Sequence, residues 1–202
     1  MRTTRLVIAS LIAGLTAVSA SAADPAAGKA KSATCAGCHA ADGNSTNPEW
    51  PKLAGQGAGY LQKQLLDFKS GKRNNALMSA QAAPLSETDM SDLAAYFASQ
   101  KTRLGVADPA LVKQGEQLYR GGNAAAGVAA CMSCHGPAGK GNPAARFPSL
   151  YGQHATYVVK ALQDYRGRAR ENDPNGMMQR VAERLTDREI KAVAQYIAGL
   201  HG

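Results

Sequence analysis

Two segments, 100 residues apart, carry apolar side chains at positions i, i+3, i+4 and i+7. They are Met90, Leu93, Ala94 and Phe97 in the first segment and Ile190, Val193, Ala194 and Ile197 in the second. This spacing places the four side chains on one face of an α-helix. Ser86-x-x-Asp89 and Thr186-x-x-Glu189 precede the two segments and are typical of capping boxes. Each segment is therefore predicted to be an amphipathic helix with one buried face.

These predicted helices belong to a longer internal repeat. At an offset of 97 residues, Trp50-Pro51-Lys52-Leu53-Ala54-Gly55-Gln56 matches Phe147-Pro148-Ser149-Leu150-Tyr151-Gly152-Gln153. The same offset pairs apolar and aromatic positions of two further predicted helices, 60–70 and 157–167, and an offset of 100 pairs the closing helices. A repeat of about half the chain indicates two copies of one domain, because solenoid repeats span only ~20–50 residues.

The boundaries of the two copies follow from helix-start signals. Asp24-Pro25 and Asp108-Pro109 each combine a residue that can cap a helix with a proline suited to its first position. We find no convincing strand pattern, so the predicted fold is all-α, with two tandem domains each wrapped round one cofactor. The first domain is predicted at residues 24–101, a linker at 102–107 and the second domain at 108–202.

A five-residue motif occurs once in each domain. Cys35-Ala36-Gly37-Cys38-His39 and Cys131-Met132-Ser133-Cys134-His135 contain all four cysteines of the protein. In C-x-x-C-H each thiol forms a thioether with a haem vinyl group, and the adjacent histidine ligates the iron. Domains this small bury little apolar surface unaided, and a covalent haem would supply it. We therefore predict two covalently attached haem c groups, with His39 and His135 as iron ligands.

Three other uses of paired C-x-x-C fit the sequence less well. The two pairs of a structural zinc site usually lie tens of residues apart, whereas these lie 96 apart. A thioredoxin-like redox pair needs a βαβ context, and no β-rich run precedes either motif. Two disulfides would not require the histidine that follows each pair.

The first 23 residues read as a signal peptide. Arg2 and Arg5 form a basic start, residues 6–18 an apolar core, and the small residues Ala20-Ser21-Ala22-Ala23 a cleavage region. The apolar core is short for a membrane span, which favours a cleaved leader over a retained anchor. We expect cleavage after Ala22 or Ala23 and a periplasmic location, where unmodified cysteines would tend to form disulfides.

The charge balance is moderately basic. Removal of the leader lowers the net charge from +8 to +6 because two arginines are lost. Residues 24–107 carry nine basic and seven acidic side chains, and residues 108–202 carry twelve and eight. This surface is compatible with an acidic redox partner or with peripheral association at an anionic membrane. Nucleic acid is a poor alternative, and we expect none as a partner, because the basic residues lack aromatic interleaving and the protein is predicted to be exported.

The second axial ligand decides whether each haem carries electrons or performs chemistry. A methionine or second histidine closes the iron, whereas an open position admits peroxide or small gases. Met78 and Met178 occupy matching places in the repeat, each in the loop predicted before the closing helix. The sequence therefore nominates Met78 and Met178 as the second ligands.

Two neighbouring candidates are weaker. Met177 competes with Met178, because a three-residue insertion around 172–176 leaves the register of this segment open. His154 has Gly57 as its counterpart, and a ligand should have a counterpart ligand, so His154 is assigned to a surface or helix-start position.

Aromatic and basic residues near the motifs each have two interpretations. Trp50, Tyr60 and Tyr157 either bind haem propionates or pack in the core with a hydrated tip. Arg73 and Arg170 either pair with propionates or lie in solvent, and we expect the solvated arrangement.

These features together resemble the cytochrome c4 family, which comprises exported dihaem proteins with two class I cytochrome c domains in tandem. The resemblance rests on both C-x-x-C-H motifs, both segments ending in Gly-Gln, the Arg73-Asn74 region, Met78, Met178 and both closing helices. It covers essentially the whole mature chain. It does not extend cleanly to the loop at 121–129, which is nine residues longer, or to the insertion before Met177.

The resemblance implies His/Met ligation of each iron and an approximate two-fold axis between the domains. It further implies single-electron transfer from a respiratory donor to a terminal oxidase, with no small-molecule substrate and no enzymatic bond chemistry. Two alternatives stay open. The chain can be the cytochrome subunit of a larger dehydrogenase, such as a sulfur-oxidising flavoprotein, or a dihaem peroxidase-type enzyme, which would require an open haem.

Overall fold

The computed structural model describes residues 22–201, so nearly all of the predicted leader lies outside the described residues. The first domain contains helices α1 (Pro25–Lys31), α2 (Ala33–His39), α3 (Ala58–Lys69), α4 (Ala76–Ala82) and α5 (Glu87–Ser99). The second contains α6 (Pro109–Gly121), α7 (Met132–His135), α8 (Ala155–Arg166), α9 (Met177–Ala182) and α10 (Asp187–Gly199), with 3₁₀ turns at Ala124–Ala126 and Pro174–Gly176. Residues 22–201 contain two isolated β-bridges and no strand, so the all-α prediction is confirmed.

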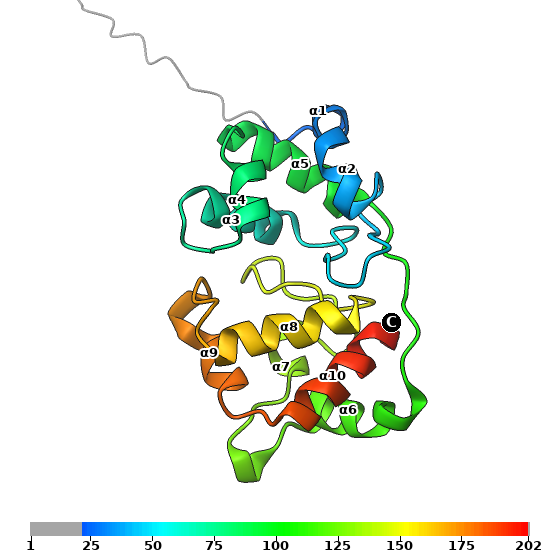
Figure 1. Ribbon diagram of the computed structural model, residues 1–202. Coiled ribbons are helices and arrows are strands. Elements are labelled where there is room, and N and C mark those ends of the chain that lie inside the picture. The colour runs from blue at the N-terminus through cyan, green and yellow to red at the C-terminus, as the bar shows by residue number, and fades with distance from the viewer. Residues whose placement is uncertain (1–21, 202) are drawn as a thin grey trace, which may run out of the picture.

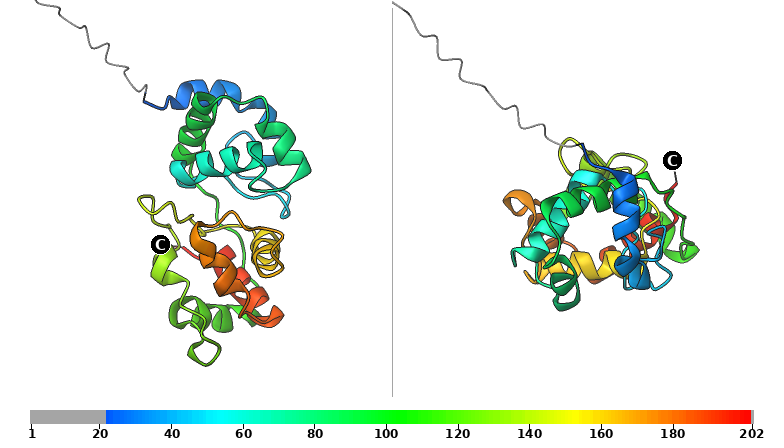
Figure 2. Two further views of the ribbon diagram at one scale, coloured as in Figure 1. Left: turned by 90° about the vertical axis from the view of Figure 1, so that its left-hand side faces the viewer. Right: turned by 90° about the horizontal axis from the view of Figure 1, so that it is seen from above.

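The helices gather into two stacked bodies joined by an extended segment at one side (Figures 1 and 2). In the first body α5 packs on α1 and α3, and in the second α10 packs on α6 and α8. The apolar faces predicted for α5 and α10 form much of the two cores, with Leu93 and Phe97 in one and Ile190 and Val193 in the other. Within residues 22–201 no helix is long and apolar enough to cross a bilayer.

The first and last helices of each domain cross at a glycine. A Cβ added to Gly28 would lie 2.0 Å from the Asp92 carbonyl oxygen, and one added to Gly115 would lie 2.1 Å from that of Ala192. No side chain fits at either crossing, so the backbones approach as closely as only glycine permits. The two domains therefore share one packing solution, as the sequence repeat predicts.

Helix starts follow the capping signals closely. The side chains of Asp24 and Asp108 accept hydrogen bonds from the first turns of α1 and α6. Both predicted capping boxes are present, at Ser86 for α5 and Thr186 for α10. These four residues act through bonds to backbone groups two or three residues away, which explains why the sequence alone locates them.

Two elements differ from the expectation. Helices α3 and α8 begin two residues before the predicted positions, directly after their N-cap residues Gly57 and His154. The segments that carry Met78 and Met178 are short helices rather than loops. The side chain of Asn75 accepts from the Met78 N–H, which begins α4, and Asp173 Oδ2 accepts from the Met178 N–H at 2.7 Å.

Candidate haem-binding sites and the interface between them

The histidine of each C-x-x-C-H motif is the last residue of its helix, α2 or α7. His39 and His135 are both 6% exposed. Their Nδ1 atoms lie 2.9 Å from the carbonyl oxygens of Pro51 and Pro148, respectively. A carbonyl can only accept, so Nδ1 carries the proton and Nε2 is left as a lone-pair donor. Burial lowers the pKa of both histidines, which keeps that nitrogen unprotonated and able to ligate a metal.

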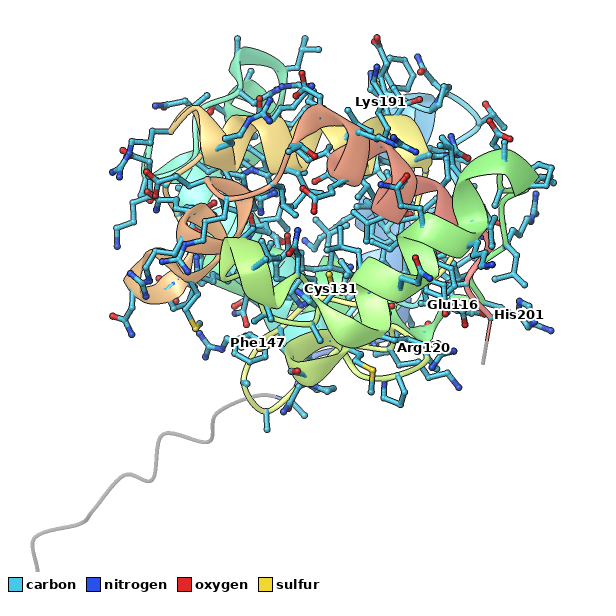
Figure 3. The ribbon with its side chains drawn as sticks, turned by 90° about the horizontal axis from the view of Figure 1, so that it is seen from below. Glu116, Arg120, Cys131, Phe147, Lys191 and His201 are labelled. Carbon is cyan, nitrogen blue, oxygen red and sulfur yellow. The ribbon has the colours of Figure 1, made fainter. Side chains whose placement is uncertain are left out.

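The cysteines of each motif lie three residues apart, on one side of a helical turn. Cys38 and Cys134 are exposed, whereas Cys35 and Cys131 are half-buried. Burial raises the pKa of the Cys35 thiol and raises that of Cys131 to about 11. Figure 3 shows Cys131 towards the middle of the second domain, whereas Glu116 and Arg120 lie along α6 and His201 lies near the C-terminal end. None of the four cysteines forms a disulfide.

The zinc alternative receives no support from the arrangement of side chains. Within residues 22–201 no group of three or more His, Cys, Asp or Glu side chains could hold a metal ion. Each cysteine pair instead lies beside one histidine, in its own domain. The donor set of each domain therefore fits thioether attachment and histidine ligation of one haem.

Both nominated methionines lie on matching helices. Met78 is half-buried on α4, and Met178 is half-buried on α9 and packs against the second core. Met177 directly precedes Met178 and is also half-buried. Successive helical residues point about 100° apart, so Met177 and Met178 face different directions.

Arg170 is buried and Arg73 is half-buried, and both guanidiniums have protein partners, so the expectation that they lie in solvent is wrong. Arg170 is 5% exposed and donates from Nη2 to the Tyr60 hydroxyl at 2.9 Å. Arg73 Nη2 donates in the same way to the Tyr157 hydroxyl at 3.2 Å. Both guanidiniums also donate to Gln64 Oε1. Each arginine finds its tyrosine in the other domain, which neighbouring residues in the sequence cannot reveal.

The interface between the domains carries excess positive charge at this point. Burial raises the pKa of Tyr157, but the guanidiniums of Arg73 and Arg170 outweigh burial and lower that pKa to about 8. Among the described residues, no carboxylate forms a salt bridge with either arginine. Carboxylate groups such as haem propionates fit this charge, because they would compensate the guanidiniums of Arg73 and Arg170.

Two glutamines form a reciprocal contact between the domains. Gln153 Oε1 accepts from the Lys52 N–H at 2.8 Å, and its Nε2 donates to the Lys52 carbonyl at 3.0 Å. Gln56 makes the same two bonds with Ser149, at 2.7 and 2.8 Å. Because Lys52 corresponds to Ser149 and Gln56 to Gln153, the paired bonds relate the domains by an approximate two-fold axis. The loops that make these contacts face one another in Figure 1.

Two side chains break this symmetry. Lys52 is 7% exposed, and its Nζ donates to the carbonyl oxygens of Arg103 and Gly152. His154 lies at the helix start, as predicted, yet its Nε2 also reaches Ser45 of the first domain, 3.0 Å from Oγ and 2.8 Å from the carbonyl oxygen. The sequence interpretation missed Lys52, Gln56 and Gln153 as interface residues. The occurrence of Gly-Gln at the same place in both copies is the signal that could have identified the glutamines.

The comparisons with known proteins agree with this geometry. The cytochrome c family profile matches residues 25–101 and 112–201. Cytochrome c4 from Pseudomonas aeruginosa is 53% identical over 192 residues, which cover 95% of this chain and 96% of that protein. A thiosulfate dehydrogenase electron acceptor from Thiomonas intermedia is 40% identical, over 86% and 81% of the two chains. The crystal structure of reduced recombinant cytochrome c4 from Pseudomonas stutzeri superposes with a TM-score of 0.87 at 49% identity, over 89% and 100%.

Two helical domains, each with a buried C-x-x-C-H histidine, define a tandem c-type cytochrome with two covalently attached haem c groups. The chain belongs to the cytochrome c4 family. Members of this family transfer electrons, so the chain is an electron-transfer protein that works with redox partners.

Proposed function

We propose that the protein is a periplasmic dihaem carrier that passes single electrons between a respiratory donor and a terminal oxidase or similar acceptor. The observation that carries the proposal is the duplicated histidine site, in which Nδ1 is fixed by a proline carbonyl and Nε2 is free to ligate. The two functional units are residues 24–101 and 108–202, joined by 102–107. The leader predicted at residues 1–23 would direct export.

The roles of the site residues follow from their chemistry. Cys35 and Cys38 attach the first haem through thioethers, and Cys131 and Cys134 attach the second. His39 and His135 are the proximal ligands. Haem iron supplies reversible one-electron chemistry, and a methionine thioether as second ligand raises its potential. Met78 and Met178 are the proposed thioether ligands, and the packing of Met178 against the second core supports its choice over Met177.

The surroundings of the sites favour electron transfer over bond chemistry. Both proximal histidines are buried and held by a hydrogen bond, which limits the movement that a change of iron charge would cause. With Met78 as the second ligand in the first domain and Met178 in the second, neither iron would be open to a substrate. The half-buried Arg73 and the buried Arg170 add two cations where the domains meet, and these would hold propionates close to the interface.

A second candidate function is that of electron acceptor within a dehydrogenase complex. The 40% identity to a thiosulfate dehydrogenase electron acceptor favours this alternative specifically. A free carrier and an acceptor subunit share one fold and one pair of sites. Copurification with a dehydrogenase subunit, and reduction of both haems by that subunit's substrate, would distinguish the second candidate from the first.

A spectroscopic redox titration of the mature periplasmic protein tests the proposal. We expect a mass with two covalent haems, two reversible one-electron couples, and low-spin spectra with the methionine–iron charge-transfer band. The reduced protein should not bind carbon monoxide. One high-spin haem, or carbon monoxide binding at one site, would support a peroxidase-type enzyme and refute the simple carrier.

A further inference from the structure

The peptide group that holds each proximal histidine also contacts the other domain. The Pro51–Lys52 peptide accepts from His39 Nδ1 through its carbonyl oxygen, and its N–H donates to Gln153 Oε1 at 2.8 Å. The Pro148–Ser149 peptide does the same, with His135 at its carbonyl and Gln56 Oε1 at its N–H, 2.7 Å away. Each histidine is therefore two hydrogen bonds from a glutamine of the opposite domain.

The glutamine amides are held in one orientation. Gln153 Oε1 accepts a second N–H, from His154 at 3.0 Å, while Nε2 donates to the Lys52 carbonyl. Gln56 Oε1 likewise accepts from the Gly57 N–H at 2.9 Å, while Nε2 donates to the Ser149 carbonyl. Both glutamines are 7% exposed, so water does not replace these bonds. The side-chain oxygen of each glutamine is thus held towards the peptide group whose carbonyl accepts from the histidine.

Hydrogen bonds in such a chain reinforce one another. When an amide oxygen accepts from a peptide N–H, electron density moves towards that peptide's carbonyl oxygen, which becomes a stronger acceptor. A stronger acceptor at Nδ1 makes the imidazole a better electron donor to a metal at Nε2. Electron donation favours the oxidised iron. This series of hydrogen bonds therefore lowers the reduction potential of the haem in the domain opposite the glutamine.

We propose that Gln153 sets the donor strength of His39 and that Gln56 sets that of His135, so each domain tunes the haem of the other. The two glutamines are positioning residues, because each acts through a peptide and a histidine rather than on the haem. The inference rests on the proposed ligation by His39 and His135. It also makes the contact between the two domains a determinant of the reduction potentials of both haems.

The test is a pair of matched variants, Gln153→Met and Gln56→Met, in the full dihaem protein. Methionine keeps the length of the side chain but accepts no strong hydrogen bond. NMR-monitored redox titration resolves the two haems by their own hyperfine-shifted signals. Each hydrogen bond in such a series is strengthened by about 10–30%. We therefore expect a two- to fourfold change in the equilibrium constant for reduction of one haem. This corresponds to a change in its reduction potential of about 18–36 mV, at 59 mV per tenfold change in the constant.

The expected pattern is crossed. Gln153→Met should raise the potential of the first-domain haem and shift the His39 Nδ1 proton signal, and Gln56→Met should do so for the second haem and His135. His154→Ala is the control. It removes an interdomain contact with Ser45 but leaves intact both series of hydrogen bonds that run from a glutamine through a peptide group to a histidine. It should shift neither potential by more than the titration error.

Three results would overturn the inference: equal shifts at both haems, a shift confined to the variant's own domain, or no shift. Each variant tests the inference by itself if the other does not assemble. In the unaltered, fully reduced protein, a scalar coupling across the Lys52 N–H to Gln153 hydrogen bond should also be measurable, and its absence would contradict the proposal without any variant. Loss of reversible one-electron couples in the unaltered protein would instead refute the proposed function.

Discussion

Met178→Ala and Met177→Ala form a matched pair that tests the assignment of the second-domain thioether. The two side chains are equal in chemistry and adjacent in sequence, but they point about 100° apart on α9. Met178 packs against the second core, and its N–H is fixed by Asp173 Oδ2 at 2.7 Å. The pair therefore separates the effect of ligation from that of removing a methionine from this helix.

The magnitude has a packing part and a ligation part. Replacing a fully buried methionine by alanine costs 2–5 kcal/mol, and Met178 is only half-buried, so packing alone should cost about 1–2 kcal/mol. Loss of a thioether ligand should also lower the potential of the second haem, because methionine ligation raises it. For Met177→Ala we expect less than about 1 kcal/mol and no change in potential, because Met177 is not the proposed ligand.

The assay combines urea unfolding with absorption spectroscopy of the oxidised and reduced protein. Met178→Ala should lose about half of the methionine–iron charge-transfer band and bind one carbon monoxide per reduced protein. Met78 in the first domain should supply the remaining half of the band. If Met177→Ala instead loses half of the band while Met178→Ala keeps all of it, the 100-residue register between Met78 and Met178 is wrong.

Three further predictions concern the scaffold and the attachment. Gly115→Ala should lower the free energy of unfolding, measured with urea, by about 1–3 kcal/mol, because the added Cβ would lie 2.1 Å from a backbone oxygen of α10. Gly121→Ala is the control. A Cβ added at Gly121 has no neighbouring atom within 4 Å, so this variant should not be destabilised. Replacing Cys131 and Cys134 together by serine should reduce the mass by one haem, and a mass that still includes two covalent haems would contradict the attachment. Hydrogen bonds from Thr186 and Asn123 lower the pKa of Glu189, so its stabilising effect is full above the ordinary value of 4.5 and declines as the pH falls through the lower folded-state value. Because Glu189 is largely accessible to solvent, which screens its charge, Glu189→Gln should cost no more than about 0.5 kcal/mol at pH 7, with the difference shrinking below pH 4.5; a constant difference across this range would refute the reasoning.

The parts of the site that the sequence predicted are those with local or repeated signals. The C-x-x-C-H motif requires only a few consecutive residues, and its two copies identify the cofactor and its number. Met78 and Met178 are nominated as ligands because the chain repeats itself and places them at matching positions, and this assignment stays a prediction. Their segments were nevertheless expected to be loops, since helices of six or seven residues carry too little periodic pattern to be recognised.

The interface shows where sequence reasoning stopped. Arg170 and Tyr60 are 110 residues apart and meet across two domains. A lone arginine is usually solvated, and nothing adjacent to Arg170 in the sequence indicates a buried partner. Lys52 was treated as an ordinary residue for the same reason, although its amine is buried against carbonyl oxygens at the domain boundary.

The sequence by itself determined the chemistry of each site, the number of domains and the helices that close them. Those features depend on covalent attachment, on capping bonds between near neighbours and on helical periodicity, all of which act within a few residues. Only the tertiary structure decided how the two sites face each other. The reciprocal bonds of Gln56 and Gln153 join backbone groups 93 and 101 residues away, and only the stacking of two folded domains brings such groups within hydrogen-bonding distance.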